Sequence, residues 1–243
     1  MEEKLKAVVL RAIDYRENDK LITLFSLEEG VVTAVARGVK KANAKLKFAA
    51  APFCFCEYVL AKKGDKRTVV SAEIIESFYS LREDIFKLYA GSAALEFVYL
   101  FVKEGMENGR LFVLLMDFLK NLCFSEADAY VLLVKFLLEA LALAGYEITV
   151  DKCAKCRKTI KNRAFFDFGI GGGICEDCRD GMSVEINPST LKLLNDVNNR
   201  PFEELVGLIY PQIIRKKAVR LLGYYIEVQA GVTVRSIARF LLL

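Results

Sequence analysis

The 243-residue sequence contains no histidine. This absence excludes Ser-His-Asp and Cys-His nucleophile pairs, and it excludes every metal site that uses imidazole. The sequence has neither of the glycine-rich phosphate-binding motifs G-x-G-x-x-G and G-x-x-x-x-G-K-[ST], and its carboxylates show no metal-binding spacing. Catalysis would have to rely on carboxylates, lysine or tyrosine alone. The sequence therefore predicts a protein that is not an enzyme.

Long uncharged apolar runs are also missing. Hydrophobic residues make up 54% of the chain, enough for a sizeable core, but charges interrupt stretches such as residues 131–144. No stretch reaches the roughly 18 uncharged apolar residues that indicate a membrane helix. The N-terminal Met-Glu-Glu-Lys-Leu-Lys carries acids and lacks the apolar segment of a signal peptide. We expect no membrane segment and a cytoplasmic location, with Cys54, Cys56 and Cys123 as reduced core residues.

Four other cysteines form two C-x-x-C pairs. Cys153 and Cys156 are followed by eighteen residues and then by Cys175 and Cys178. Each pair can direct both sulfurs at one ion, and two pairs complete a tetrahedral zinc site. Because protein ligands fill all four positions, we expect one structural Zn²⁺ with no open position for substrate.

Two other interpretations of these cysteines are possible. A thioredoxin-type redox site needs one C-x-x-C pair at a helix start inside a βαβ unit, and disulfides need an oxidising compartment. The sequence indicates neither context. Between the pairs, Phe165, Phe166 and Phe168 suit a short strand, and residues 171–173 are three glycines that let the chain reverse. This layout predicts a small zinc ribbon.

The N-terminal part of the chain has a strand pattern. Short apolar, β-branched runs are separated by turn residues, and no helical pattern interrupts them. Five strands in about 75 residues suit a small barrel such as the OB-fold, which commonly binds single-stranded nucleic acid. The expected strands are residues 5–13, 20–25, 31–36, 53–60 and 68–75.

Basic residues concentrate in two loops of this barrel. The segment 37–47 contains five basic residues and no acid, and the turn region 62–67 adds four more. Such cations neutralise phosphates and release counterions, whereas a merely solvated loop usually mixes both signs. The same charge could serve an acidic protein segment or a membrane surface. The predicted phosphate contacts are Arg37, Lys40, Lys41, Lys45, Lys47, Lys62, Lys63, Lys66 and Arg67.

From Leu81 onward the pattern is helical. We expect helices over 83–103 and 111–122, then a helix capped by Ser125 that is apolar almost all round and ends near Gly145. A helix of that kind is normally the buried centre of a bundle. After the ribbon, Asn187 and Pro211 each precede a further helix.

The expected fold is therefore α+β, with an OB-fold barrel followed by a helical domain that carries an inserted four-cysteine ribbon. The predicted domains are an OB-fold nucleic-acid-binding domain (1–80), a first helical part (81–150), the zinc ribbon (151–181) and a C-terminal helical part (182–243).

Two further basic groups lie outside the barrel. Six cations fall within twelve ribbon residues that contain no acid, and they could form a second phosphate contact or a solvated loop. On the helix after Pro211, apolar residues take one side and cations the other, which suits an acidic peptide or ordinary packing. The ribbon cations are Lys152, Lys155, Arg157, Lys158, Lys161 and Arg163.

The order of these parts resembles the RecO family of DNA repair and recombination mediator proteins. The resemblance covers nearly the whole chain, including the helical middle and the four-cysteine ribbon. The motifs that carry it are Val8-Val9-Leu10-Arg11, Tyr15-Arg16-Glu17-Asn18-Asp19-Lys20-Leu21, Thr23-Leu24-Phe25, Gly30, Ala36-Arg37-Gly38-Val39-Lys40-Lys41, Gly171-Gly172-Gly173 and Val234-Arg235-Ser236.

The resemblance implies a bacterial, nucleoid-associated protein that binds single- and double-stranded DNA and anneals complementary strands. It implies help for RecA loading on strands covered by single-stranded DNA-binding protein, together with RecR. Arg11 and Arg16 join the predicted DNA contacts. The acidic tail of single-stranded DNA-binding protein would be a partner of the helical domain. From their charge, our candidate residues for this tail-binding site are Arg215, Lys216, Lys217 and Arg220.

Two other classes of function remain open from the residues alone. One is an RNA-binding OB and zinc-ribbon protein of transcription or translation, which a direct DNA–RNA competition would distinguish. The other is a protein-only adaptor for acidic partners, which would bind no nucleic acid at physiological salt.

Overall fold

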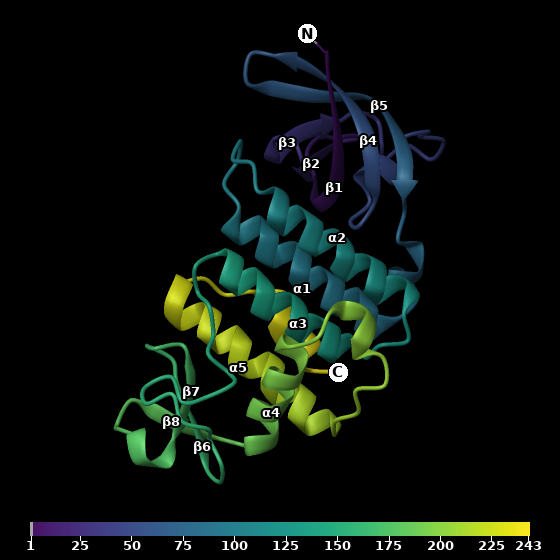
Figure 1. Cartoon of the computed structure of the whole chain (residues 1–243). Helices are drawn as coiled ribbons and strands as arrows, with labels where there is room; N and C mark the ends of the chain where they lie inside the picture. The colour runs from purple at the N-terminus through teal and green to yellow at the C-terminus, as the bar shows by residue number, and fades with distance from the viewer. Residues whose placement is uncertain (1) are drawn as a thin grey trace. The chain divides into compact units, whose positions relative to one another are not determined.

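The computed structural model describes residues 2–243 and divides into two compact units (Figure 1). The first unit comprises Met1–Asp84 and Leu95–Leu119, and the second comprises Ile85–Ala94 and Lys120–Leu243. Within the described residues, none of the helices combines the length and apolar composition needed to cross a bilayer. The predicted four-part division of the chain stays a prediction.

The first unit contains a closed five-stranded barrel of the OB type, as predicted. Its strand order is β1-β2-β3-β5-β4, with one parallel pair, β3 with β5, at Val35 and Thr68. Alternate residues of the strands point inward, and Tyr58 lies fully buried, donating a hydrogen bond to the Ala49 carbonyl at 2.9 Å. The strands are β1 (Glu2–Asp14), β2 (Lys20–Ser26), β3 (Gly30–Ala36), β4 (Phe55–Lys63) and β5 (Lys66–Glu76).

A backbone segment after α1 (Ile85–Phe101) packs tightly against the start of β3. The Gly105 N–H donates to the Val31 carbonyl at 3.1 Å, and Val31 forms a parallel bridge with Glu104. Gly30 has φ +67°, and a Cβ there would lie 1.9 Å from the Met106 carbonyl oxygen. Glycine is therefore needed at this position for two reasons, the backbone conformation and the close approach.

We expect Gly30→Ala to destabilise the protein by about 3 kcal/mol, since a left-handed alanine and a backbone clash both add cost. Gly64→Ala is the matched control: Gly64 has φ +59° but no atom within 4 Å of its added Cβ. That control should lose only about 1 kcal/mol. Urea unfolding of both variants measures the difference, and equal losses would contradict the packing argument.

Helices make up most of the second unit. Beyond α1 and α2 (Gly109–Phe124), the chain forms α3 (Ala129–Leu143), α4 (Pro188–Asn198), α5 (Gln212–Ala230) and α6 (Arg235–Phe240). Helix α3 is buried almost all round, as its sequence predicts, and α4 and α5 pack against it.

The predicted cap of α3 is wrong by three residues. Asp128 is the N-cap, and its carboxylate accepts hydrogen bonds from the Tyr130 and Val131 N–H groups at 3.0 and 3.2 Å. Ser125 instead accepts from the Ala127 N–H at 3.2 Å, which makes a local turn before the helix. Both residues are good caps, and the turn places the aspartate, not the serine, at the first free N–H groups.

The ribbon is a three-stranded sheet in the order β7-β6-β8. Its strands are β6 (Ala164–Asp167), β7 (Gly172–Cys175) and β8 (Ser183–Ile186), the last lying beyond the predicted ribbon segment 151–181. Phe165 and Phe166 lie in β6, as predicted, whereas Phe168 lies one residue beyond the end of that strand.

The three ribbon glycines have different roles. Gly171 alone has a positive φ, +75°, and makes the reversal. Gly172 and Gly173 lie within β7, where a Cβ would meet the Thr149 carbonyl at 2.9 Å and the Leu191 side chain at 3.1 Å, respectively. These two glycines therefore permit close packing and do not reverse the chain.

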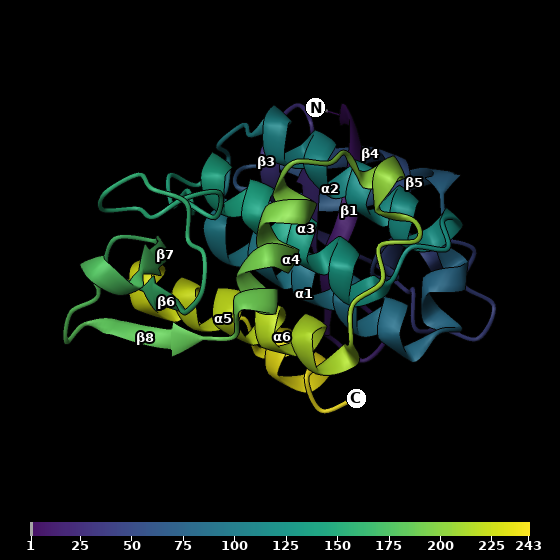
Figure 2. The same ribbon diagram turned by 60° about the horizontal axis from the view of Figure 1, so that its bottom comes forward.

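The ribbon packs on α5 within the second unit (Figure 2). The Phe166 ring meets Tyr225 edge-on at 6.0 Å between centroids, and Phe168 meets Tyr224 at 4.8 Å. Gln229 donates to the Phe168 carbonyl at 2.5 Å. These contacts fix the ribbon on the helices that carry it.

Candidate nucleic-acid interface and metal centre

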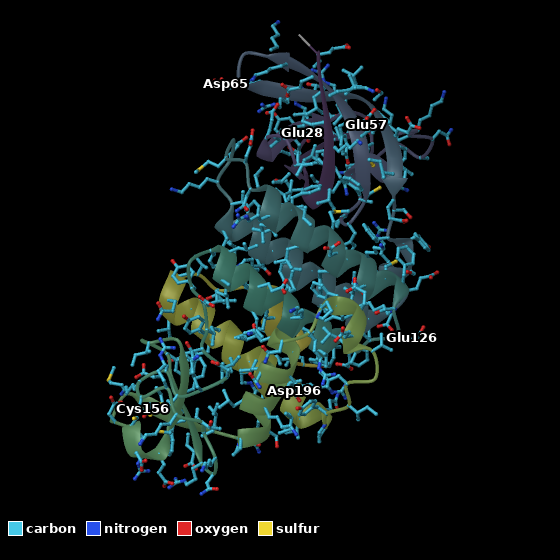
Figure 3. The ribbon with its side chains drawn as sticks, in the orientation of Figure 1. Glu28, Glu57, Asp65, Glu126, Cys156 and Asp196 are labelled. Atoms are coloured by element: carbon cyan, nitrogen blue, oxygen red, sulfur yellow. The ribbon has the colours of Figure 1, made fainter. Side chains whose placement is uncertain are left out.

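The four ribbon cysteines lie together at one end of the ribbon, where Cys156 is labelled in Figure 3. Their sulfurs all lie within 4.8 Å of one another, and Cys156 Sγ is 3.7 Å from Cys175 Sγ. A zinc–sulfur bond of about 2.3 Å in a tetrahedron places ligand sulfurs about 3.8 Å apart. None of these four cysteines forms a disulfide. The cluster therefore fits a metal ion with four thiolate ligands.

Local backbone geometry holds the first cysteine pair. The Cys153 N–H donates to the Lys158 carbonyl at 2.8 Å, and the Arg157 N–H donates to the Cys153 carbonyl at 2.9 Å. The Cys175 N–H points at Cys153 Sγ from 3.4 Å. Arg157 completes the turn with φ +64°, a conformation that costs a non-glycine residue about 1–2 kcal/mol.

Electrostatics within the cluster favour a cation. Burial raises the pKa of Cys153, but hydrogen bonds from the backbone at Cys156, Cys175 and Lys155 outweigh it and lower the pKa to about 6. In contrast, hydrogen bonds with the Cys156 and Cys175 thiols raise the pKa of Cys178 to about 12. The first thiol therefore loses its proton readily, whereas deprotonation of a second thiol is unfavourable. A bound metal ion would make that second deprotonation favourable.

Two loops of the barrel form one basic surface. The Gly38 N–H donates to the Asp19 carboxylate at 2.8 Å, the Lys40 N–H donates to the Asn18 carbonyl at 3.1 Å, and Lys40 Nζ pairs with Asp14 at 2.7 Å. These bonds tie the β1–β2 loop to the β3–β4 loop. We call residues 15–19 and 37–47 together the loop surface.

The loop surface carries most of the predicted barrel contacts. Lys40 is ion-paired with Asp14, and no other basic residue of the loop surface has a carboxylate partner in the described structure. Arg16 lies over the exposed Tyr15 ring at 5.2 Å from its centroid. The exposed cations without such a partner are Arg16, Arg37, Lys41, Lys45 and Lys47.

The β4–β5 hairpin forms a separate basic end of the barrel, at the turn where Asp65 is labelled in Figure 3. Lys62, Lys63 and Lys66 are exposed there. Arg67 differs from them, because its side chain is only 14% exposed and pairs with Glu3 at 2.5 Å and Glu29 at 2.7 Å. Those bonds tie β5 to β1 and to the β2–β3 turn, so Arg67 has a structural role.

Arg11 lies in a groove of about 390 Å³ on the outer face of the barrel. Its guanidinium stacks over the Tyr99 ring at 5.6 Å from the centroid, and Ile13 and Thr23 line the same groove. Sequence reasoning missed Tyr99, because a tyrosine in an apolar helix gives no signal of exposure. Tyr99 is 39% exposed.

The six ribbon cations divide into two groups. Lys152 pairs with Asp151 at 3.2 Å, Lys155 with Asp180, and Arg163 with Glu185 at 2.7 Å and Glu176 at 3.1 Å. The other three are exposed and have no carboxylate partner among residues 2–243: Arg157, Lys158 and Lys161.

The basic residues of α5 also divide. Arg215 pairs with Asp128 and lies over the Tyr130 ring at 5.9 Å, so it connects α5 to the start of α3. Lys216 is half-buried, and Lys217 and Arg220 are exposed. Apolar side chains lie exposed just before and inside the helix, with Ile209 at 90% and Ile213 at 58%.

Comparison with known proteins covers both units. The family model "Recombination protein O N terminal" matches residues 1–78, and "Recombination protein O C terminal" matches residues 82–237. DNA repair protein RecO of Pelotomaculum thermopropionicum is 34% identical over 231 residues, covering 92% of this chain and 89% of the relative. The protein of that name from Alkaliphilus metalliredigens is 31% identical, covering 93% and 92%, and that from Clostridium novyi is 30% identical, covering 92% and 88%.

The two family matches fall on the barrel and on the helices with their ribbon, in the order in which the motifs occur in the sequence. Identity of about one third extends over nine-tenths of the chain. The chain therefore belongs to the RecO family of DNA repair proteins.

Proposed function

We propose that this protein binds single- and double-stranded DNA and anneals complementary strands. The observation that supports this best is the loop surface, where five exposed cations lack acidic partners on an otherwise ordered pair of loops. Cations of this kind replace condensed counterions on phosphates. The anchoring bonds to Asp19, Asn18 and Asp14 hold the loops in place before DNA arrives, which lowers the entropy cost of binding.

Annealing requires two physical effects, and both are available here. Repulsion between two polyanions must be screened, and bases must stay accessible for pairing. Phosphate contacts carry no sequence information, so the protein should act on any complementary pair. Exposed Tyr15 and Tyr99 can stack on bases without selecting among them. The protein then acts by binding, not by catalysis.

We further propose that it assists RecA loading on strands covered by single-stranded DNA-binding protein, together with RecR. The relatives described above are named as DNA repair proteins. The binding site for the acidic tail of single-stranded DNA-binding protein is the exposed part of α5, where cations lie near exposed isoleucines. We also propose that the four clustered cysteines hold one structural Zn²⁺, because four protein ligands would fill a tetrahedral site and leave no position open for substrate.

The test is annealing of two complementary strands at low and physiological salt, with and without a coat of the cognate single-stranded DNA-binding protein. We expect acceleration on bare and on coated strands. Binding without annealing would reduce the protein to a generic nucleic-acid binder, and tighter binding to RNA in direct competition would favour an RNA function. Absence of binding at both salts would overturn the proposal and favour an adaptor for acidic proteins.

The proposed binding site for the acidic tail on α5 can be tested separately from DNA binding. Replacing Lys216, Lys217 and Arg220 by alanine should weaken binding of the acidic tail peptide roughly tenfold, because exposed ion pairs each contribute about 0.2–1 kcal/mol. Annealing of bare strands should stay at the wild-type rate. Fluorescence anisotropy with the labelled peptide measures the first quantity. Unchanged peptide affinity would show that the tail binds elsewhere.

A further inference from the structure

Two cavities lie on the ribbon and at the start of helix α4 within the second unit. A cavity of about 550 Å³ beside the second cysteine pair and one of about 360 Å³ beside the start of α4 share three lining residues, Thr159, Lys161 and Asn162. Ser189 and Lys192 of α4 line the far end. We call this feature the ribbon groove.

The ribbon groove has an excess of unpaired positive charge. Arg157, Lys158 and Lys161 line its first cavity and Lys192 its second, and none has a carboxylate partner in the described part of the chain. Acids also line the groove. Asp151 pairs with Lys152 and Glu176 pairs with Arg163, which leaves Asp177 as the one lining acid without an ion pair among residues 2–243.

Arg157 gives independent support. Its backbone is left-handed, with φ +64°, in the turn that positions Cys153 and Cys156. Glycine would fill this turn without strain. A strained residue points to a role for its side chain beyond the turn itself. The feature gained by arginine over glycine is a cation at the wall of the groove.

We propose that the ribbon groove binds the phosphodiester backbone of a second nucleic-acid strand, separately from the barrel. This proposal rests on the proposed function. Lysine and arginine side chains would neutralise phosphates, while the Thr159 hydroxyl and the Asn162 amide can donate hydrogen bonds to phosphate oxygens.

The lining chemistry favours a nucleic-acid strand over an acidic peptide. No aromatic ring lines either cavity, and aliphatic side chains such as Ile160 and Leu191 line only the second cavity. The first cavity, which three of the four unpaired cations line, has no aliphatic side chain to anchor an apolar peptide residue. A site that grips only the backbone leaves bases turned outward and free to pair. That property suits a strand about to be annealed to a partner held elsewhere on the protein.

The test counts bound strands on the full-length, zinc-loaded protein. The probe is an oligothymidylate of about eight nucleotides, within the 4–16 nucleotides that one OB-fold contacts. Wild type should bind two per chain. The variant Arg157→Gly, Lys158→Ala, Lys161→Ala should bind one. The site that it loses should show, in wild type, a slope of log affinity against log salt to which these three cations contribute about two units. A barrel variant lacking Arg37, Lys41, Lys45 and Lys47 should also bind one.

Two controls accompany the count. The variant Lys120→Ala, Arg200→Ala, Arg239→Ala removes the same charge from exposed positions outside the groove, and it should still bind two strands. Arg157→Gly alone should melt at or above the wild-type temperature while the groove site weakens, because strain and cation leave together. If binding were lost because the protein unfolded, the melting temperature and the affinity of the groove site would both fall.

The outcomes separate the two proposals. The groove inference fails if the groove variant still binds two oligonucleotides. It also fails if wild type binds only one and the groove variant binds one as well. Either result would leave the barrel function intact. No strand bound by wild type would overturn both proposals. If a glutamate octapeptide displaced the groove-bound strand at equal concentration, the groove would be a peptide site and the inference would fail.

Discussion

Cys175→Ser is expected to release one zinc ion per chain and unfold the ribbon while the barrel stays folded. Apart from its contacts with α5, little within the ribbon itself would hold it folded. Its own apolar cluster contains three fully buried residues, Cys153, Phe165 and Ile174, and its strands are four residues long. Structural zinc sites contribute about 10 kcal/mol or more of folding free energy at neutral pH. The free energy lost with the metal is therefore larger than the stabilisation that so small an apolar core can provide.

Two measurements check this result. Metal analysis should give one zinc for wild type and less than a tenth of that for the variant after dialysis against a chelator. Amide exchange should show loss of protection over residues 153–186 and none in β1–β5. Cys123→Ala is the matched control, because Cys123 is a buried cysteine outside the cluster and its loss should leave the zinc content unchanged. Full zinc content in Cys175→Ser would contradict a four-thiolate site.

Alanine at Arg37, Lys41, Lys45 and Lys47 together is expected to weaken single-strand binding about 10²–10³-fold at 0.1 M salt. Each phosphate contact contributes about 0.7 to the slope of log affinity against log salt, so four contacts account for nearly three units of slope. Lys40 is left in place because its ion pair with Asp14 anchors the loop. The variant thus removes charge without loosening the loop surface.

Anisotropy titrations of a labelled oligonucleotide at several salt concentrations measure both quantities. The matched control removes four exposed cations of the first unit outside the loop surface and should keep affinity within about threefold, as expected for screened charges at a distance. An unchanged slope in the loop variant would place the DNA elsewhere. The control replaces Lys4, Lys6, Lys103 and Arg110 by alanine.

The parts of the fold that could be predicted from the sequence are those set by local patterns. Short apolar, β-branched runs bounded by turn residues predicted all five barrel strands, and the spacing of four cysteines predicted their cluster. Both signals depend on residues close in the chain. The cap at Asp128 was misplaced because Ser125 offers an equally suitable side chain, and only the backbone turn distinguishes them.

Charge pairing could not be predicted in this way. The run of cations from Lys152 to Arg163 contains two residues whose acidic partners, Asp180 and Glu185, lie more than twenty residues away in sequence. Arg67 meets Glu3 across 64 residues. Basic runs therefore overstate the charge available to a ligand, and tertiary structure decides which cations remain unpaired.

The packing of Phe166 and Phe168 against Tyr225 and Tyr224 has a consequence for the order of events during synthesis. All four clustered cysteines lie within one short segment, so the cluster can assemble as soon as that segment leaves the ribosome. The tyrosines that cover its aromatic face follow 46 and 47 residues after Cys178, which takes a few seconds at about 5–20 residues per second. During that interval the ribbon of the nascent chain exposes Phe166 and Phe168, the aromatic side chains that the tyrosines later cover.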